Sequence, residues 1–119
     1  MLQKKYRLKK YSAFSATYKL KNTVADDKVC MYFGKEKNDN EKTTKIAFVV
    51  SKKIHKRAVV RNRIKRLMRE SFRLIIKDGG YSKFNNYMSI ICIARNNAIG
   101  ANFNEIDTSI KRLLEKKCK

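Results

Sequence analysis

The sequence predicts an α+β fold, an α-β sandwich in which helices pack on a small central sheet. Short apolar runs bounded by polar residues or glycine predict strands, and a long segment with apolar residues at helical spacing predicts an amphipathic helix. The elements follow the order helix, strand, strand, helix, strand, helix along 119 residues, the length of one domain. Hydrophobic residues make up 43% of the chain, which is enough for a core.

The chain begins with a basic arm over residues 1–10, which is a candidate for disorder until a partner binds. Ser12 is a suitable N-cap for a short helix over roughly residues 13–20. Phe14 and Tyr18 are four residues apart, so they would share one face of that helix.

Three runs predict strands. Residues 29–33 are apolar and aromatic, and residues 45–51 form a second strand after a polar, turn-prone stretch (35–44) that we interpret as a hairpin loop. The stretch between residues 20 and 28 leaves room for one more short strand. Residues 87–95 are almost continuously apolar, which is typical of a central strand buried on both faces.

A long helix is predicted over residues 58–77, after a polar connection (52–57) and before a glycine stop at Gly79 and Gly80. One face carries Val60, Ile64, Leu67, Met68, Ser71 and Ile75, and the opposite face carries Asn62, Arg66, Arg69 and Arg73.

A last helix is predicted over about 105–117, with Asn104 as its cap. Its inward side chains would be Ile106, Ile110, Leu113 and Leu114. Residues 115–119 form a basic tail, which is a second candidate for disorder without a partner.

Charge is the strongest guide to function. The formal net charge is +20 and the pI about 10.2, so self-repulsion opposes folding unless a polyanion is bound. The long helix is rich in arginine and contains a single carboxylate, Glu70. Arginine binds phosphate bidentately, and release of counterions would drive association with a nucleic acid. A merely solvated basic face would carry more acidic partners. We therefore interpret residues 1–119 as a single RNA-binding domain.

Several classes of protein are disfavoured. Three cysteines without a CxxC pair and one histidine, His55, provide no plausible zinc set, and no residues are arranged for acid–base or two-metal catalysis. We expect Cys30 and Cys92 to be small core residues and Cys118 an unpaired thiol, as in a reducing cytosol. We expect a cytoplasmic protein, since no membrane span or signal peptide is evident.

The aromatic residues have two interpretations. Phe14, Tyr18 and Tyr32 could be ordinary core residues, or they could form a surface on which single-stranded bases stack. Composition leaves both open.

The stretch Ala58-Val59-Val60-Arg61-Asn62-Arg63-Ile64-Lys65-Arg66 and its continuation to Arg73 resembles the signature of the protein component of bacterial ribonuclease P. Residues 6–14, 48–53 and 91–95 resemble other stretches of that family but are weak alone.

This resemblance implies a left-handed βαβ crossover through the long basic helix, against the usual right-handed rule. It implies the protein subunit of a ribonucleoprotein that removes the 5′ leader from precursor tRNA by endonucleolytic hydrolysis. The RNA subunit would perform the catalysis with Mg2+, so the protein alone would be inactive, with no catalytic residue, protein metal site or organic cofactor. Its partners would be the RNA subunit, at one protein per RNA, and precursor tRNA, with no membrane.

The resemblance also assigns residues to two surfaces. Contact with the RNA subunit or a metal-rich junction near its active site is implied for Arg61, Asn62, Arg63, Lys65, Arg66 and Arg69. We predict that Arg73, on the same basic helix, also contacts the RNA subunit. The aromatic positions of a leader-binding cleft are matched by Phe14, Tyr18 and Tyr32. A phosphate path beside the cleft would be lined by Lys52, Lys53, Lys56 and Arg95. His55 matches no assigned position.

Three alternatives compete. A structural RNA-binding protein of the ribosomal type would share the size and charge but would not need an aromatic cleft. A DNA-binding regulator would need a helix-turn-helix partner or dimerisation heptads, and neither is evident. A protein-only nuclease is the least consistent, because the carboxylates are scattered.

Overall fold

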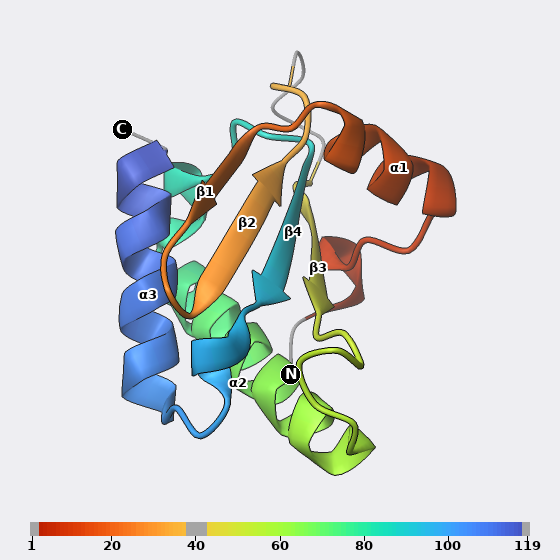
Figure 1. Cartoon of the computed structure of the whole chain (residues 1–119). Coiled ribbons are helices and arrows are strands. Elements are labelled where there is room, and N and C mark those ends of the chain that lie inside the picture. Colours follow the sequence, from red (N-terminus) through yellow and green to blue (C-terminus); the bar gives the residue numbers. More distant parts are fainter. Residues whose placement is uncertain (1–2, 38–42, 118–119) are drawn as a thin grey trace.

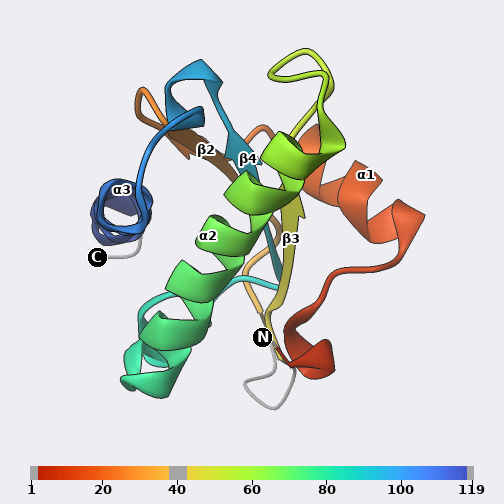
Figure 2. The same ribbon diagram turned by 90° about the horizontal axis from the view of Figure 1, so that it is seen from below.

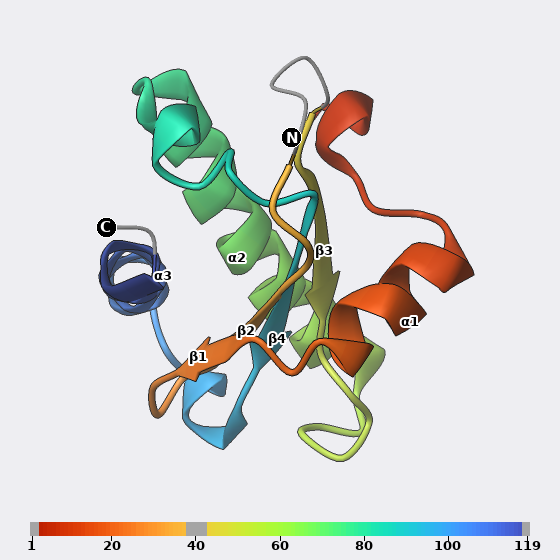
Figure 3. The ribbon, with the colours of Figure 1, turned by 90° about the horizontal axis from the view of Figure 1, so that it is seen from above.

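The computed structural model describes residues 3–37 and 43–117, and these form a three-layer α/β arrangement. A four-stranded sheet with the order β1-β2-β4-β3 lies between α1 on one face and α2 and α3 on the other (Figures 1, 2 and 3). The elements are η1 (Lys4–Tyr6), α1 (Tyr11–Lys19), β1 (Thr23–Ala25), β2 (Val29–Phe33), β3 (Lys45–Val49), α2 (Ala58–Lys77), η2 (Gly80–Lys83), β4 (Ser89–Ala94), η3 (Asn96–Ala98) and α3 (Phe103–Lys117).

The predicted sandwich, the extra short strand and the order of elements are confirmed. Both helix caps were predicted wrongly. Lys10 precedes α1 without a side-chain bond, so Ser12 is not the cap. Before α3, Asn102 rather than Asn104 is the capping residue. Asn102 Oδ1 accepts the N–H of Glu105 at 2.9 Å, and the Glu105 carboxylate accepts the N–H of Asn102 in return.

The predicted hairpin between the second and third strands is also wrong. β2 and β3 are not neighbours, because β4 pairs antiparallel with β2 and parallel with β3 between them. The parallel pair requires a crossover, which α2 supplies from the end of β3 to the start of β4. The implied left hand of this crossover stays a prediction. β4 is the central strand that its sequence predicts, with all but Ile93 buried.

The main core lies between the sheet and the helices α2 and α3. Alternate residues of β2 point into it, and so do Ile90 and Cys92 of β4. The helices contribute residues at helical spacing. The predicted inward residues that are buried are Ile64, Met68, Ser71, Ile75, Ile106, Ile110, Leu113 and Leu114, and Val60 and Leu67 are partly buried. Phe72, which was not among the predicted inward residues, is also fully buried. Cys92 is a core residue as predicted, whereas Cys30 is only half-buried on the opposite face of the sheet. Cys118 lies outside the described residues.

α1 is fixed to the second face of the sheet by a buried pair of hydroxyls. Thr17 Oγ1 donates to the carbonyl of Ala13 at 2.7 Å and lies 2.6 Å from Ser89 Oγ, which therefore donates to Thr17. Gly34 follows β2 at this point, where a Cβ would clash with the Ser89 hydroxyl. This anchor holds one end of α1 against the sheet.

The basic arm is part of the fold from Gln3 onward. Residues 4–6 form η1, and Arg7 pairs with Ile46 as a short parallel extension of the sheet beyond β3. The Leu8 N–H donates to the Ile46 carbonyl at 2.9 Å. Residues 115–117 belong to α3. Disorder of the arm and tail in the absence of RNA stays a prediction, and residues 1–2 and 118–119 lie outside the described part of the chain. Among the helices of the described residues, none has the length and apolar character to cross a membrane.

Candidate nucleic-acid interface

The outer arc of α2 forms a continuous basic surface. Because Ile64, Met68 and Phe72 fix the buried stripe, the predicted cations must turn outward or to the flanks. Arg66 and Asn62 are exposed at the centre of the arc. The half-buried flank facing the arm carries Arg61, Lys65 and Arg69. Nε of Arg61 is buried without a hydrogen-bond partner among the described residues.

Two of the seven α2 side chains predicted to contact RNA already form hydrogen bonds within the protein. Arg63 Nη2 donates to the carbonyl of Ala101 at 3.0 Å, which holds the turn before α3 against α2. Arg73 Nε donates to Glu70 at 2.9 Å, and this bond lowers the pKa of Glu70. The positive charge of Arg73 is therefore partly neutralised, and Arg66 and Arg69 are better placed to meet phosphate.

The predicted aromatic residues gather on the α1 side of the sheet. Tyr18 from α1 and Tyr32 from β2 meet edge to face, with ring centroids 5.0 Å apart. Burial, with Tyr32 and Cys30 nearby, raises the pKa of the Tyr18 phenol. Phe14 lies one turn before Tyr18 and lines a pocket of about 390 Å3 together with Tyr11, Ser15, Tyr18 and Lys19. These rings are half-exposed, so they are neither pure core nor isolated surface groups.

Cys30 lies beside this aromatic pair, two residues before Tyr32 on the same face of β2. Burial raises the pKa of the Cys30 thiol, and Arg95 partly opposes that shift. Cys30 is thus a native reporter group at the edge of the aromatic surface.

The residues of the predicted phosphate path lie on two loops at one end of the sheet, where β3 and β4 terminate. Because β3 and β4 are parallel, their carboxyl ends meet there, and Lys52 and Lys53 follow β3 while Arg95 follows β4. All three side chains are exposed, as is that of Lys56. Arg95 Nη1 also donates to the carbonyl of Asp26 at 2.8 Å. His55, which had no assignment, accepts the Arg57 N–H on Nδ1 at 3.1 Å and thereby closes the turn into α2.

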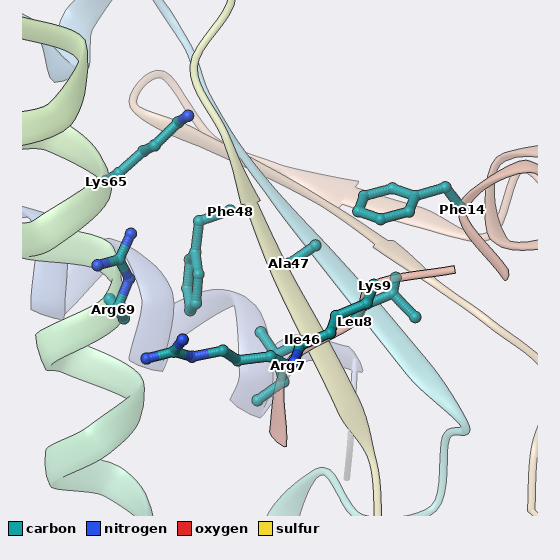
Figure 4. Close-up of a pocket in the computed structure, with 9 residues that line it drawn as sticks. All are labelled: Arg7, Leu8, Lys9, Phe14, Ile46, Ala47, Phe48, Lys65 and Arg69. Atoms are coloured by element: carbon teal, nitrogen blue, oxygen red, sulfur yellow. The ribbon is translucent and has the colours of Figure 1, made fainter. Parts of the chain in front are cut away.

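A second pocket, of about 330 Å3, lies over the outer edge of β3 and was not foreseen from the sequence (Figure 4). It unites Phe14 of the aromatic group with Lys65 and Arg69 of the basic helix. Arg7, Leu8 and Phe48 complete its walls. No local motif could have identified it, because it depends on the arm pairing with β3.

In the described part of the chain, no group of three or more His, Cys, Asp or Glu residues could hold a metal ion. The carboxylates there serve the fold instead. Asp26 Oδ1 accepts the N–H groups of Lys28 and Val29. Asp107 accepts from Ser71 at 2.7 Å and pairs with Lys111 at 2.9 Å.

Comparison with known proteins identifies the family. The family model described as Ribonuclease P matches residues 2–118. The ribonuclease P protein component of Clostridium kluyveri is 39% identical over 112 residues, covering 93% of each chain. That of Clostridioides difficile is 37% identical over 109 residues, covering 92% of this chain and 89% of the other.

Solved structures agree with this assignment. The Staphylococcus aureus RNase P protein has a TM-score of 0.74 and 32% identity, covering 96% of this chain and 98% of that chain. The Thermotoga maritima RNase P protein, at 20% identity and a TM-score of 0.73 over 92% of this chain and 96% of that chain, shares the fold. The chain therefore belongs to the ribonuclease P protein family, and its function is the family's role as a subunit of ribonuclease P, an endoribonuclease complex that processes tRNA 5′ ends.

Proposed function

We propose that this subunit binds two RNAs on two separate surfaces. The basic arc of α2 binds the RNA subunit, one protein per RNA, and the aromatic side of the sheet binds the single-stranded 5′ leader of precursor tRNA. The observation that carries the proposal is the half-exposed Tyr18–Tyr32 pair, which lies across the sheet from α2.

The α2 surface suits a folded RNA because its cations are spread over a broad arc rather than along one groove-width stripe. Each phosphate neutralised by Arg61, Lys65, Arg66 or Arg69 releases counterions, so affinity for RNA should fall steeply with salt. Arg63 contributes differently, by holding the turn at Ala101 in position beside the arc.

The aromatic side suits a leader of variable sequence. Stacking of a base on an aromatic ring contributes about 1–3 kcal/mol and is tolerant of sequence because every base has a π face. Phe14, Tyr18 and Tyr32 offer such rings, and Lys52, Lys53, Lys56 and Arg95 offer cations for the leader phosphates. Precursor tRNA would gain these contacts and mature tRNA would not, which gives the complex a preference for its substrate.

Catalysis is proposed to reside in the RNA subunit, with Mg2+ held mainly by RNA. The structural roles of Asp26, Glu70 and Asp107 support this. Asp26 accepts backbone N–H bonds, Glu70 neutralises an arginine, and Asp107 accepts from Ser71 and pairs with Lys111, so each is a poor candidate for metal or proton chemistry. The protein would act by neutralising phosphate charge, so that the RNA subunit works at moderate Mg2+.

The test is cleavage of a precursor tRNA by a bacterial ribonuclease P RNA at low Mg2+, with and without this protein. We expect stimulation, a cut at the mature 5′ end, and no cleavage by protein free of RNA. Phe14→Ala and Tyr32→Ala should weaken binding of precursor but not of mature tRNA.

Met88→Ala is the control variant, because Met88 is exposed and lies outside α1, β2 and α2. Mg2+-dependent cleavage by protein free of RNA would overturn the assignment of catalysis. Equal losses for precursor and mature tRNA in the aromatic variants would overturn the assignment of the leader surface.

A further inference from the structure

The pocket over the β3 edge has three walls from distant parts of the chain. Residues 7–9 of the arm form one wall, residues 46–48 of β3 form the floor, and Lys65 and Arg69 of α2 form the other side. Figure 4 shows the Arg7 and Arg69 side chains extending beside the Phe48 ring, with Lys65 beyond it and Phe14 across the strand.

Phe48 gives this pocket an aromatic surface that is fixed in place. Its ring meets Phe72 of the core edge to face, with centroids 5.6 Å apart, yet Phe48 is only partly buried and lines the pocket. Leu8 lies on the other side of β3 from this ring and adds an apolar surface to the wall that the arm forms (Figure 4). The packing against Phe72 orders the ring before any ligand arrives, so a stacking partner would not have to supply that ordering entropy.

The edge of β3 is also incompletely paired. The Ile46 carbonyl accepts from Leu8, so the peptide groups of Ile46 and Phe48 share the outer edge of the sheet. Among the described residues no backbone bond joins the arm to Phe48. An N–H and a C=O therefore border the pocket next to the Phe48 ring, a donor and an acceptor that a base edge could use.

The charge of the pocket selects an anion. Four of its nine lining residues are cations (Arg7, Lys9, Lys65 and Arg69), and none of the nine is acidic. Arg7, Lys65 and Arg69 are partly withdrawn from water, which strengthens their attraction for a phosphate. A neutral peptide strand could pair with the β3 edge but would bring no negative charge to this pocket.

An apolar aromatic floor beside a rim of guanidinium groups fits a nucleotide. The volume of about 330 Å3 lies at the lower end of ligand pockets, which run from about 300 to 1,000 Å3, so it suits one nucleotide rather than a base pair. We propose that this pocket binds a single unpaired RNA nucleotide, with its base against Phe48 and its phosphate between Arg7 and Arg69.

The inference deepens the proposed function and rests on it for the source of the nucleotide. Phe14 belongs to the proposed leader surface, while Lys65 and Arg69 belong to the proposed RNA-subunit surface. The occupant is thus a nucleotide of the leader or of the RNA subunit, at the place where the two surfaces meet.

Mononucleotide binding to the protein alone is the first test. Adenosine 5′-monophosphate is titrated into methyl-labelled protein, with ribose 5-phosphate as the probe without a base. We expect saturable shifts at the Ile46 methyls, which lie on the Phe48 face of β3, with the nucleotide and much smaller shifts with the sugar phosphate. Equal shifts from both probes, or shifts spread over all of α2, would overturn the proposal.

Variants locate the two contacts. Phe48→Leu should weaken nucleotide binding by at least about fivefold, the lower bound expected for one stacked base. Arg7→Gln removes a charge-assisted contact to the phosphate and should weaken binding by at least about tenfold. Arg112→Gln on α3 is the matched control, because Arg112 is exposed and outside the pocket. Phe48→Leu could loosen the contact with Phe72. If thermal unfolding shows that this variant is destabilised, the test rests on Arg7→Gln. Unchanged affinity in Arg7→Gln would contradict the proposal.

Cross-linking in the assembled complex distinguishes the two sources. 4-Thiouridine is placed either in the leader or in unpaired positions of the RNA subunit, and the cross-linked peptide is identified. A cross-link to the peptide containing Phe48 from one of the two RNAs would assign the nucleotide to that RNA. No cross-link from either would mean that only free nucleotides enter, and would overturn the RNA assignment. These outcomes are independent of cleavage stimulation, so failure of the pocket and failure of the proposed function are separable.

Discussion

The two faces of the sheet both carry apolar and aromatic side chains, but these side chains are buried on one face and partly exposed on the other. On the face toward α2 and α3, Val29, Met31 and Phe33 are fully buried. On the face toward α1, the intervening residues Cys30 and Tyr32 remain half-exposed. Two helices cover the first face, whereas α1, fixed at Thr17, covers only part of the second.

The difference shows how one strand can serve the core and an open surface at once. Side chains alternate along β2, so a single five-residue strand supplies the core with every second residue and the proposed leader surface with the others. Rigidity on the packed face is what holds the rings on the open face in position. We therefore expect substitutions on the two faces to separate cleanly into stability effects and binding effects.

The largest effect is expected on the packed face. Met68→Ala removes a fully buried side chain of α2 beside Cys92 and should lower the free energy of unfolding by about 2–5 kcal/mol. Chemical denaturation at fixed phosphate concentration measures it. Val59→Ala is the control because Val59 is 80% exposed, and a similar loss in both variants would contradict the assigned burial.

The second effect is expected on the open face. Tyr32→Leu removes the aromatic ring but keeps an apolar side chain, and it should weaken the binding of precursor tRNA by about 5- to 150-fold, the equivalent of about 1–3 kcal/mol. The unfolding free energy should change far less than in Met68→Ala. Parallel titrations with mature tRNA, which should be unaffected, are the control. Protection of the Cys30 thiol from alkylation by a leader-bearing RNA would give independent support.

The third effect concerns electrostatics on α2. Arg66→Ala should reduce the slope of log affinity against log salt by roughly one unit, because one phosphate contact is lost. Arg73→Ala should reduce it less, since Glu70 already partly neutralises Arg73. Binding of the RNA subunit measured across a series of salt concentrations tests both variants. Equal slopes for the two variants would mean that Arg73 leaves Glu70 when RNA binds.

The smallest effect is expected from the Glu70–Arg73 pair itself. The Arg73 hydrogen bond lowers the pKa of folded Glu70 below that of an unfolded glutamate, about 4.3. The pair therefore stabilises the fold fully above the unfolded pKa, and this stabilisation is lost as pH falls through the lowered value. The Tm difference between wild type and Glu70→Gln, measured from pH 7 to pH 3, should shrink toward acid. A difference independent of pH would contradict this.

Local patterns predicted most of the secondary structure. The bounds of α2 and β2 follow directly from the periodicity of residues 58–77 and 29–33, because helical and strand spacing are local properties. The cap before α3 was missed by two residues because Asn102 and Asn104 are chemically equal candidates. Only the reciprocal bond with Glu105 distinguishes them.

The candidate site was predicted only in part. The basic helix and the three aromatic residues are evident from composition and from the resemblance to the family. That Tyr18 and Tyr32 touch depends on a contact between α1 and β2, and that Arg63 and Arg73 are engaged within the protein depends on Ala101 and on the Glu70 rotamer. No local sequence pattern predicts that these particular residues contact one another.

The sequence by itself determined the elements, the amphipathic faces, the excess of positive charge and the family, because propensity, periodicity and a contiguous signature are all local. Tertiary structure alone decided that β4 lies between β2 and β3, that Cys30 faces outward while Cys92 is buried, and that the arm, β3 and α2 enclose a pocket around Phe48. The physical reason is that strand pairing and helix packing are chosen by the total burial and hydrogen bonding of the whole chain, and no single segment contains that information.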